Sequence, residues 1–355
     1  MTVTPVPAEM SLFLGNYVSD VFKNKRNEVK VLSLISKKSF SELLENALSS
    51  SIDRFDWSFE KILDRENFVL SKGNLRRDLY VRSIRSDFYV LENGPYTYVI
   101  TRGNKRFIKS GIYYLIRKLY PEVIMAYLTS MDIYELLNNF RKNKEVDIYY
   151  KRAVSKNMSG EQDTDVTYKR KVVKVDFREA FRKASSQEQW VDKILLFTDG
   201  FRYHFNLSRD GILKFKQGSF NDYWSLLVQI CDRYMDRVKL FSNRSRLDQP
   251  YHRTKPLIFP FQEPIFDDVI IRNQFLDIIG EYPFCFYSVV HAGNPHIHVN
   301  VVDKLDKSMY SLRTHSSNSI IIGPQIKTTE ASIMRILKYL VENFREANIV
   351  DLSGD

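Results

Sequence analysis

The stretch HIHVNVVDKLDKSMYSLR, residues 296–313, holds the clearest folding signal in this 355-residue chain. Polar and apolar side chains alternate along residues 296–302, as expected for a strand with one face toward a core. The short link at residues 304–307 leads to a second strand-like run at residues 309–313, so the two runs form a predicted hairpin. We therefore expect the C-terminal part of the chain to be built on an antiparallel sheet.

Further runs on both sides extend this hairpin to a meander of four strands enclosed by two helices. Two more strands are expected at residues 284–290 and 319–322, and the helices at residues 273–279 and 329–344. The last helix has apolar residues at helical spacing, and Thr328 is its expected N-cap. The order helix, meander, helix predicts an α+β layer arrangement.

The rest of the chain mixes helical and alternating patterns, which predicts an α+β fold with mixed or antiparallel sheets and packed helices. The polar run Asn157–Asp165 has no apolar periodicity and is typical of a linker. We expect an N-terminal, mostly helical segment, a basic α/β domain, a linker, a basic central α/β region and a C-terminal α+β domain. Their expected bounds are residues 1–71, 72–156, 157–166, 167–256 and 257–355.

Positive charge is concentrated in two separate parts of the chain. Residues 72–118 contain eleven Lys and Arg against three Asp and Glu, and residues 167–261 contain nineteen against ten. The formal net charge of the whole chain is +10. Tyrosines and phenylalanines are interleaved with the cations of the first block. A basic surface attracts the phosphates of nucleic acid, and exposed rings stack on bases.

Residues 102–106 form the most distinctive basic turn, because three cations and a glycine lie between a predicted strand and a predicted helix. The turn lacks the glycines and the lysine-hydroxyl pair of a Walker loop, so nucleoside triphosphate binding is not indicated. Residues 168–174 form a second basic cluster. The predicted nucleic-acid contacts are Arg76, Arg77, Arg82, Arg85, Arg102, Lys105, Arg106, Lys109, Lys169, Arg170 and Lys171.

The histidines of the C-terminal part suggest a different chemistry. On a strand, His296, His298 and Asn300 share one face, and His291 and Asp303 lie near its ends. Two imidazoles at this spacing can converge on a metal ion or a phosphate. The run resembles the strand of histidine-triad nucleotide hydrolases, although the third position is Asn300, and we transfer no activity from that family. The cluster is the candidate site of a metal-dependent phosphodiesterase or nuclease.

The hydropathy pattern, the N-terminal sequence and the cysteine spacing exclude several classes of protein. No apolar run approaches the ~18 residues of a membrane-spanning helix, and the N-terminus is not typical of a signal peptide. Cys231 and Cys285 have the spacing of neither a disulfide framework nor a zinc finger. We expect a soluble, cytoplasmic protein without a cofactor.

Three hypotheses follow from these patterns. The first is a nucleic-acid-binding, non-catalytic subunit of a DNA- or RNA-processing or antiviral host-defence assembly, whose basic surface contacts backbone phosphates. Its C-terminal domain would contact a protein partner or mediate self-association. The second is the nuclease, and the third is a protein-binding scaffold. The first hypothesis requires the two basic blocks to fold into one surface. The sequence does not decide whether the nucleic acid is DNA or RNA, or whether it is single- or double-stranded.

Overall fold

The fold is taken from a computed structural model. It describes residues 6–23, 28–49, 55–65, 67–78, 83–157, 162–166, 174–241, 256–261, 263–293, 296–325, 327–347 and 350–351. The chain divides into two compact units, one of residues 1–155 and 162–234 and one of residues 156–161 and 235–355. The expected boundaries at residues 71 and 166 do not separate units in the structure, because the strands on both sides of them share one sheet.

The first unit is built from helices around one large sheet. The helices are α1 (Ala8–Lys23), α2 (Phe40–Ser49), α3 (Lys105–Phe107), α4 (Tyr113–Lys118), α5 (Ser130–Lys144), α6 (Phe177–Ser186) and most of α7 (Phe220–Phe241). A π-helical turn, η1 (Ile108–Ile112), joins α3 to α4, and a 3₁₀ turn, η2 (Asp199–Phe201), follows β9. The strands are β1 (Val29–Ser36), β2 (Phe55–Arg65), β3 (Phe68–Asp78), β4 (Ser83–Asn93), β5 (Tyr96–Thr101), β6 (Val123–Met125), β7 (Ile148–Lys156), β8 (Gln162–Val166), β9 (Trp190–Thr198), β10 (His204–Ser208) and β11 (Ile212–Gln217).

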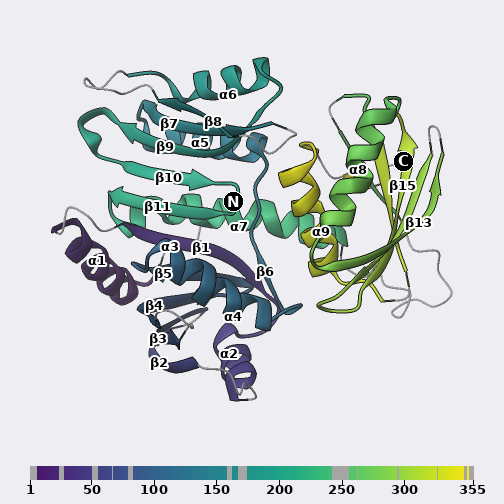
Figure 1. The fold of residues 1–355 in the computed structure, drawn as a ribbon. Helices are drawn as coiled ribbons and strands as arrows, with labels where there is room; N and C mark the ends of the chain where they lie inside the picture. Colours follow the sequence, from purple (N-terminus) through teal and green to yellow (C-terminus); the bar gives the residue numbers. More distant parts are fainter. Residues whose placement is uncertain are drawn as a thin grey trace. The chain divides into compact units, whose positions relative to one another are not determined.

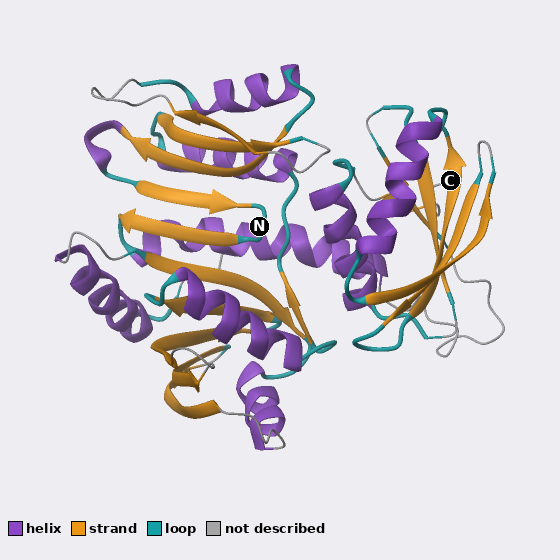
Figure 2. Ribbon diagram, viewed as in Figure 1, coloured by secondary structure: helices purple, strands orange, loops and turns teal. Residues whose placement is uncertain are grey.

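These strands lie in the order β2-β3-β4-β5-β1-β11-β10-β9-β7-β8, with β6 beside β1. Helices cover the two faces unequally (Figure 1, Figure 2). On the face that we call the α4 face, Leu32 and Val99 pack with Phe107 and other residues of the α3–α4 segment. On the opposite α7 face, the ring of Tyr223 lies 4.9 Å from that of Phe215.

Strand β1 is the centre of this sheet, and all eight of its residues are buried. One edge pairs with β5 over Lys30–Ile35, and the other edge pairs with β11 over Val29–Leu32 and with β6 over Leu34–Ser36. We did not predict β1, because a strand covered on both faces shows no alternation of apolar and polar residues. The segment expected to be mostly helical therefore contributes β1, β2 and the start of β3 as well as α1 and α2.

The second unit confirms the predicted C-terminal order of helix, four-stranded meander and helix. Its elements are α8 (Val269–Glu281), β13 (Cys285–Ala292), β14 (Ile297–Asp303), β15 (Met309–Ser316), β16 (Ser319–Pro324) and α9 (Glu330–Asn343), with β12 (Leu257–Pro260) and β17 (Val350–Asp351) added. The sheet order is β13-β14-β15-β16-β12-β17. The N-cap of α9 is Thr329 rather than Thr328, because Thr329 Oγ1 accepts from Ser332 N at 3.1 Å. In the first unit, strand β8 lies within the segment expected to be a linker.

A buried ion pair joins β14 to α9 in this unit. The carboxylate of Asp303 is fully buried and accepts from Arg335 Nη1 at 2.7 Å and from Ser332 Oγ at 2.9 Å. Removing one partner of a buried pair leaves an uncompensated charge, which costs more than an exposed ion pair contributes.

The variant Arg335→Ala should destabilise the second unit by about 3–5 kcal/mol, because Asp303 keeps its burial and loses its cation. Hydrogen exchange of β14 and α9 amides, followed by mass spectrometry, measures this loss as a lower free energy of opening. Lys338→Ala is the control, since its i,i+4 pair with Glu342 on the same helix is more exposed than the pair of Arg335 with Asp303. A loss below about 1 kcal/mol for Arg335→Ala would contradict this account of Asp303.

Candidate nucleic-acid interface

The predicted contacts of the first basic block do not share one surface. Arg76 and Arg85 are exposed cross-strand partners on β3 and β4. The neighbouring Arg77 points to the opposite face, where its guanidinium lies 4.2 Å from the centre of the Tyr114 ring. Arg102 donates to the carbonyl oxygen of Tyr17 and lies 3.9 Å from the centre of its ring. Arg102 is thus committed to holding α1.

Three residues of that block, Lys105, Arg106 and Lys109, are exposed on the α3–η1 segment as a phosphate contact requires. Arg82, Lys169, Arg170 and Lys171 lie outside the described residues. Many other cations of the second block form ion pairs with nearby carboxylates: Lys174 with Asp199, Arg178 with Asp176, Arg182 with Glu179, Lys183 with Asp165, and Arg233 with Glu135.

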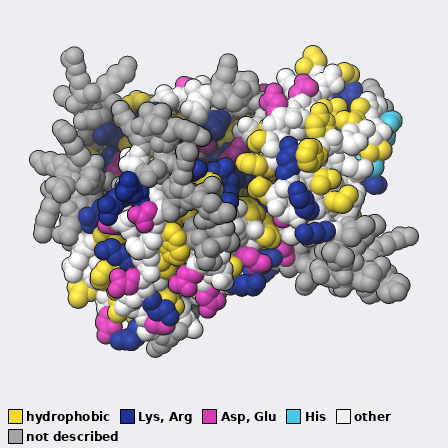
Figure 3. Space-filling model, turned by 60° about the horizontal axis from the view of Figure 1, so that its bottom comes forward, with side chains coloured by type: hydrophobic (Ala, Val, Ile, Leu, Met, Phe, Trp, Pro, Cys, Tyr) yellow, Lys and Arg dark blue, Asp and Glu magenta, His cyan; other side chains and the backbone are white. Residues whose placement is uncertain are grey.

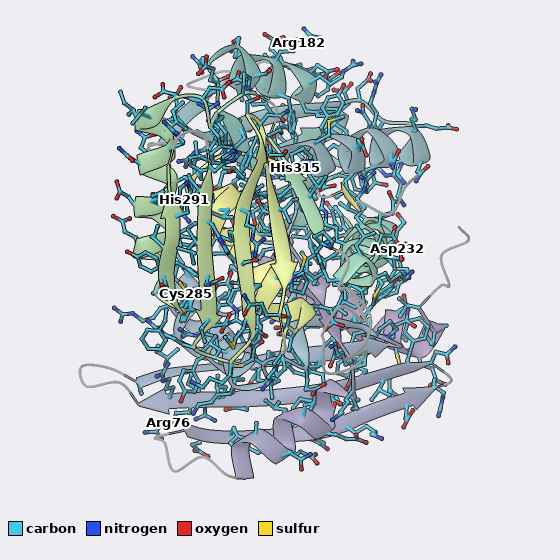
Figure 4. The ribbon with its side chains drawn as sticks, turned by 90° about the vertical axis from the view of Figure 1, so that its right-hand side faces the viewer. Arg76, Arg182, Asp232, Cys285, His291 and His315 are labelled. Atoms are coloured by element: carbon cyan, nitrogen blue, oxygen red, sulfur yellow. The ribbon has the colours of Figure 1, made fainter. Side chains whose placement is uncertain are left out.

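The views agree that positive charge is spread over the first unit. Arg76 of β3 and Arg182 of α6 lie toward opposite ends of this unit (Figure 4). On the face drawn in Figure 3, dark-blue Lys and Arg side chains form separate groups with magenta carboxylates among them. A continuous basic field made of both blocks is therefore not what the fold produces. A smaller set of lysines does converge.

That set lies on the part of the α4 face that the described helices leave uncovered. The α3–α4 segment packs over β1, β4 and β5, whereas β9, β10 and β11 carry no described helix on this side (Figure 1). On β10, His204, Asn206 and Ser208 are half-buried, while the intervening Phe205 and Leu207 are buried. This alternation is typical of a strand covered on one face only.

Lysines from several strands line this open face. Lys30 of β1 is the cross-strand partner of Lys214 of β11, and Asn206 of β10 continues the same row. In an adjacent row, Ser208 of β10 is the partner of Lys193 of β9. Cross-strand partners project from the same side of a sheet, so these side chains are neighbours. We call the following residues the lysine face: Lys30, Lys105, Lys193, Lys214 and Lys216.

The two basic blocks meet at the lysine face. Lys30 Nζ donates to the carbonyl oxygen of Gly103 at 2.8 Å, which fixes the basic turn of residues 102–106 beside β1. The charge of Lys105, from that turn, contributes to lowering the pKa of Lys214 in the second block. Lys105 of the first block thus acts electrostatically on Lys214 of the second, whereas the single surface of both blocks that the first hypothesis requires is not formed.

The surroundings of the lysine face disfavour the charged form of some of its lysines. Burial, followed by the charge of Lys193, lowers the pKa of Lys214 to about 8. Burial also lowers the pKa of Lys30, although the carboxylate of Glu28 opposes this shift. An approaching anion would reverse both effects, because it stabilises the charged form of each lysine.

Glu28 offsets part of this charge through its pair with Lys216, whose Nζ lies 2.9 Å from a carboxylate oxygen. Burial raises the pKa of Glu28, but the hydrogen bond and charge of Lys216 outweigh it, so the pKa is lowered overall. Burial, then the charges of Lys216 and Lys151, lowers the pKa of His204 to about 4. This imidazole is therefore neutral at pH 7.

Two buried polar atoms on β10 also lie at the lysine face. Within the described part of the chain, Nε2 of His204 and Oδ1 of Asn206 are buried and have no hydrogen-bond partner. Leaving a buried polar atom unpaired costs free energy, so a site that presents two of them beside lysines suits a polar ligand.

Aromatic side chains lie at one end of the lysine face. The rings of Phe197 and Phe201 are stacked, 5.1 Å apart at 21°. Tyr149 of β7 lies 5.7 Å from Phe197, and the Nζ atom of Lys174 lies 5.6 Å from the centre of the Tyr149 ring. His204 completes the group, 6.2 Å from Phe201.

The structure does not assemble the predicted histidine site. His291 and His298 are cross-strand partners, and His298 Nε2 accepts from Arg313 Nε at 3.2 Å. Asp303 projects from the opposite, buried face of β14 and pairs across the sheet with Cys285, which lies at the other end of β13 from His291 (Figure 4). His296 is exposed. Across the described residues, no three His, Cys, Asp or Glu side chains gather in a way that could hold a metal ion.

Comparison with known proteins adds no functional information. No family model matches the sequence, and no curated protein matches it. Among the helices that the structure describes, none is both long and apolar enough to cross a membrane. Function is therefore inferred from the lysine face itself.

Sequence reasoning missed most of the lysine face. Lys30 and Lys193 are single cations within apolar strands, and Lys214 shares a short strand with Lys216, so none of them stands out as part of a charged run. The available signal was a lysine recurring in several predicted strands. That signal identifies a common surface only when the strand order is known.

Proposed function

We propose that the protein binds nucleic acid and contacts backbone phosphates through the lysine face. The observation that supports this most strongly is the convergence of Lys193 and Lys214 from two strands of an uncovered sheet face, beside the buried Lys30 of β1. Burial lowers the pKa of Lys30 and of Lys214, so their charged forms are costly unless an anion occupies their surroundings. Phosphate is the anion that suits several ammonium groups at once.

The spacing of the lysines favours a polyanion over a single phosphate. Neighbouring strands lie about 4.8 Å apart, so Lys30 and Lys214 are close neighbours, while Lys193 of β9 is about 10 Å from β11. Successive phosphates of a nucleic-acid backbone match lysines that are spread over three strands of one sheet.

We propose a binding role rather than hydrolysis, because the carboxylate of Asp303 serves α9 instead of the histidines. In this proposal the protein is a non-catalytic subunit of a DNA- or RNA-processing or host-defence assembly. Both cysteines are free and buried, which is compatible with the reducing cytoplasm, where we expect it to act.

The double variant Lys193→Gln/Lys214→Gln should bind DNA and RNA at least tenfold more weakly at low salt, because two ammonium groups that meet phosphates are removed. The dependence of log K on log salt should also become shallower, by about 0.9 per neutralised phosphate on duplex and about 0.7 on single strands. Fluorescence anisotropy of labelled oligonucleotides over a salt series measures both quantities.

The matched control is Lys38→Gln/Lys61→Gln, which removes the same charge from two exposed lysines of the first unit. The control should keep the affinity and slope of the wild type. An equal loss of affinity in both double variants would show that only net charge matters, and it would overturn the lysine face as the site.

For the second unit we propose self-association through strand β13. This strand forms one edge of its sheet, and it carries no charged residue. Several of its apolar side chains are exposed, and Figure 3 shows yellow hydrophobic groups on the surface of this unit. The exposed fractions are 65% for Phe286, 46% for Tyr287, 43% for Val289 and 54% for Val290.

A second copy of the chain is the occupant that fits this edge. Natural edge strands usually carry charges or proline that prevent pairing, and β13 carries neither. Two copies of an uncharged strand pair antiparallel without like-charge contacts and bury the same residues on both sides. Val269 and Ile270 at the start of α8 are also exposed, and Arg272 of this helix donates to Gly293 O just beyond the end of β13.

The variant Phe286→Lys/Val290→Lys should convert a dimer of twice 41.9 kDa to a monomer, because charges at an edge prevent strand pairing. Sedimentation equilibrium over a concentration series measures the mass. Leu305→Lys, at an exposed apolar residue in the β14–β15 turn, should leave the dimer intact. A wild type that stays monomeric at high concentration, or a dimer unaffected by the double variant, would refute this interface.

A further inference from the structure

We propose that the ligand of the lysine face is single-stranded nucleic acid, and that one of its bases stacks on Phe201. This inference rests on the proposed function and makes it specific. It is supported by a separate observation, an exposed aromatic ring held at the end of the lysine face.

The backbone presents the ring of Phe201 to solvent. Phe201 lies in turn η2 with φ 56°, directly after Gly200 with φ 64°. A bulky side chain rarely adopts this left-handed conformation, which costs free energy, and such residues concentrate at functional sites. One side of the ring is stacked on Phe197, and 37% of the residue remains exposed. The free side of the ring is therefore available to a flat partner.

The ring of Phe201 lies directly beside the lysine face. His204 lies against Phe201 and is two residues from Asn206, the cross-strand partner of Lys214. Lys216 of β11 directly precedes Gln217, the cross-strand partner of His204, so this lysine is also close. A chain whose phosphates follow the lysines can therefore bring a base to Phe201.

Further aromatic and basic residues lie near the stacked rings of Phe197 and Phe201. Tyr149 lies beside Phe197, and Lys174 lies over Tyr149 while paired with Asp199 of turn η2. Rings that alternate with cations are typical of surfaces that bind single strands, where bases stack and phosphates meet lysines.

A duplex does not fit this arrangement. Its bases are stacked on one another and paired, so no base face is available to a protein ring. A single strand exposes its bases and loses little by transferring one to Phe201. The ring should therefore contribute to the affinity for single strands and contribute nothing for duplexes.

The variant Phe201→Asn removes the ring and keeps a residue that tolerates positive φ. It should weaken binding of a short oligodeoxythymidylate by about 5- to 150-fold, the range expected for one stacked base. Its salt dependence should stay that of the wild type, because every lysine still meets its phosphate. Phe201→Tyr retains a ring and should restore the affinity, and binding of a duplex of equal length should be the same in all three proteins.

A second measurement reports stacking directly. In Phe201→Trp, the oligodeoxythymidylate should quench fluorescence beyond the quenching seen in the wild type, whereas the duplex should not. Thermal unfolding of each variant shows whether the fold is retained. Unchanged affinity of a folded Phe201→Asn, with Lys193 and Lys214 still required, would overturn the stacking site and leave the proposed function. Binding that no longer depends on those lysines would overturn both.

Discussion

The pairing of β1 with β5 on one edge and with β11 on the other is the interaction on which the first unit depends. Strand β5 lies in the first basic block of the sequence and β11 in the second. Without β1, the two blocks would belong to separate sheets. Lys30 lies in the middle of this junction, 9% exposed, and its ammonium group is held by the carbonyl oxygen of Gly103. The lysine face is a direct result of this strand order.

The two units differ in how far their buried or half-buried charges are compensated by charges of opposite sign. In the second unit, Asp303 meets Arg335 and strand β14 is thereby fixed to a helix, so the charge is compensated within the fold. In the first unit, Lys214 has lysines as neighbours, and its pKa is lowered to about 8. The charge of Asp303 is compensated by Arg335, whereas that of Lys214 is offset only in part by Glu28, which makes its surroundings a candidate ligand site.

The sequence predicted the parts of the fold in which one face of each strand meets solvent. The meander of the second unit was predicted because Ile297, Val299 and Val301 alternate with polar residues. Strand β1 was not predicted, because both of its faces are buried. The candidate site was predicted only in part. Lys105 belongs to it, but Arg102 is held by Tyr17, and Asp303 lies on the wrong face of β14 for the histidines. These outcomes depend on strand order and on contacts between distant residues, which composition and spacing do not contain.

The titration of the Lys214 ammonium group by NMR, without and with a short oligodeoxythymidylate, tests the central claim most directly. Burial and Lys193 favour the neutral amine in the free protein, so the account predicts a midpoint near the pKa of about 8. A bound phosphate stabilises the ammonium form, so the midpoint should move to higher pH in the complex. The account would be contradicted by a midpoint that stays unchanged when the oligonucleotide binds, since the phosphates would then lie elsewhere.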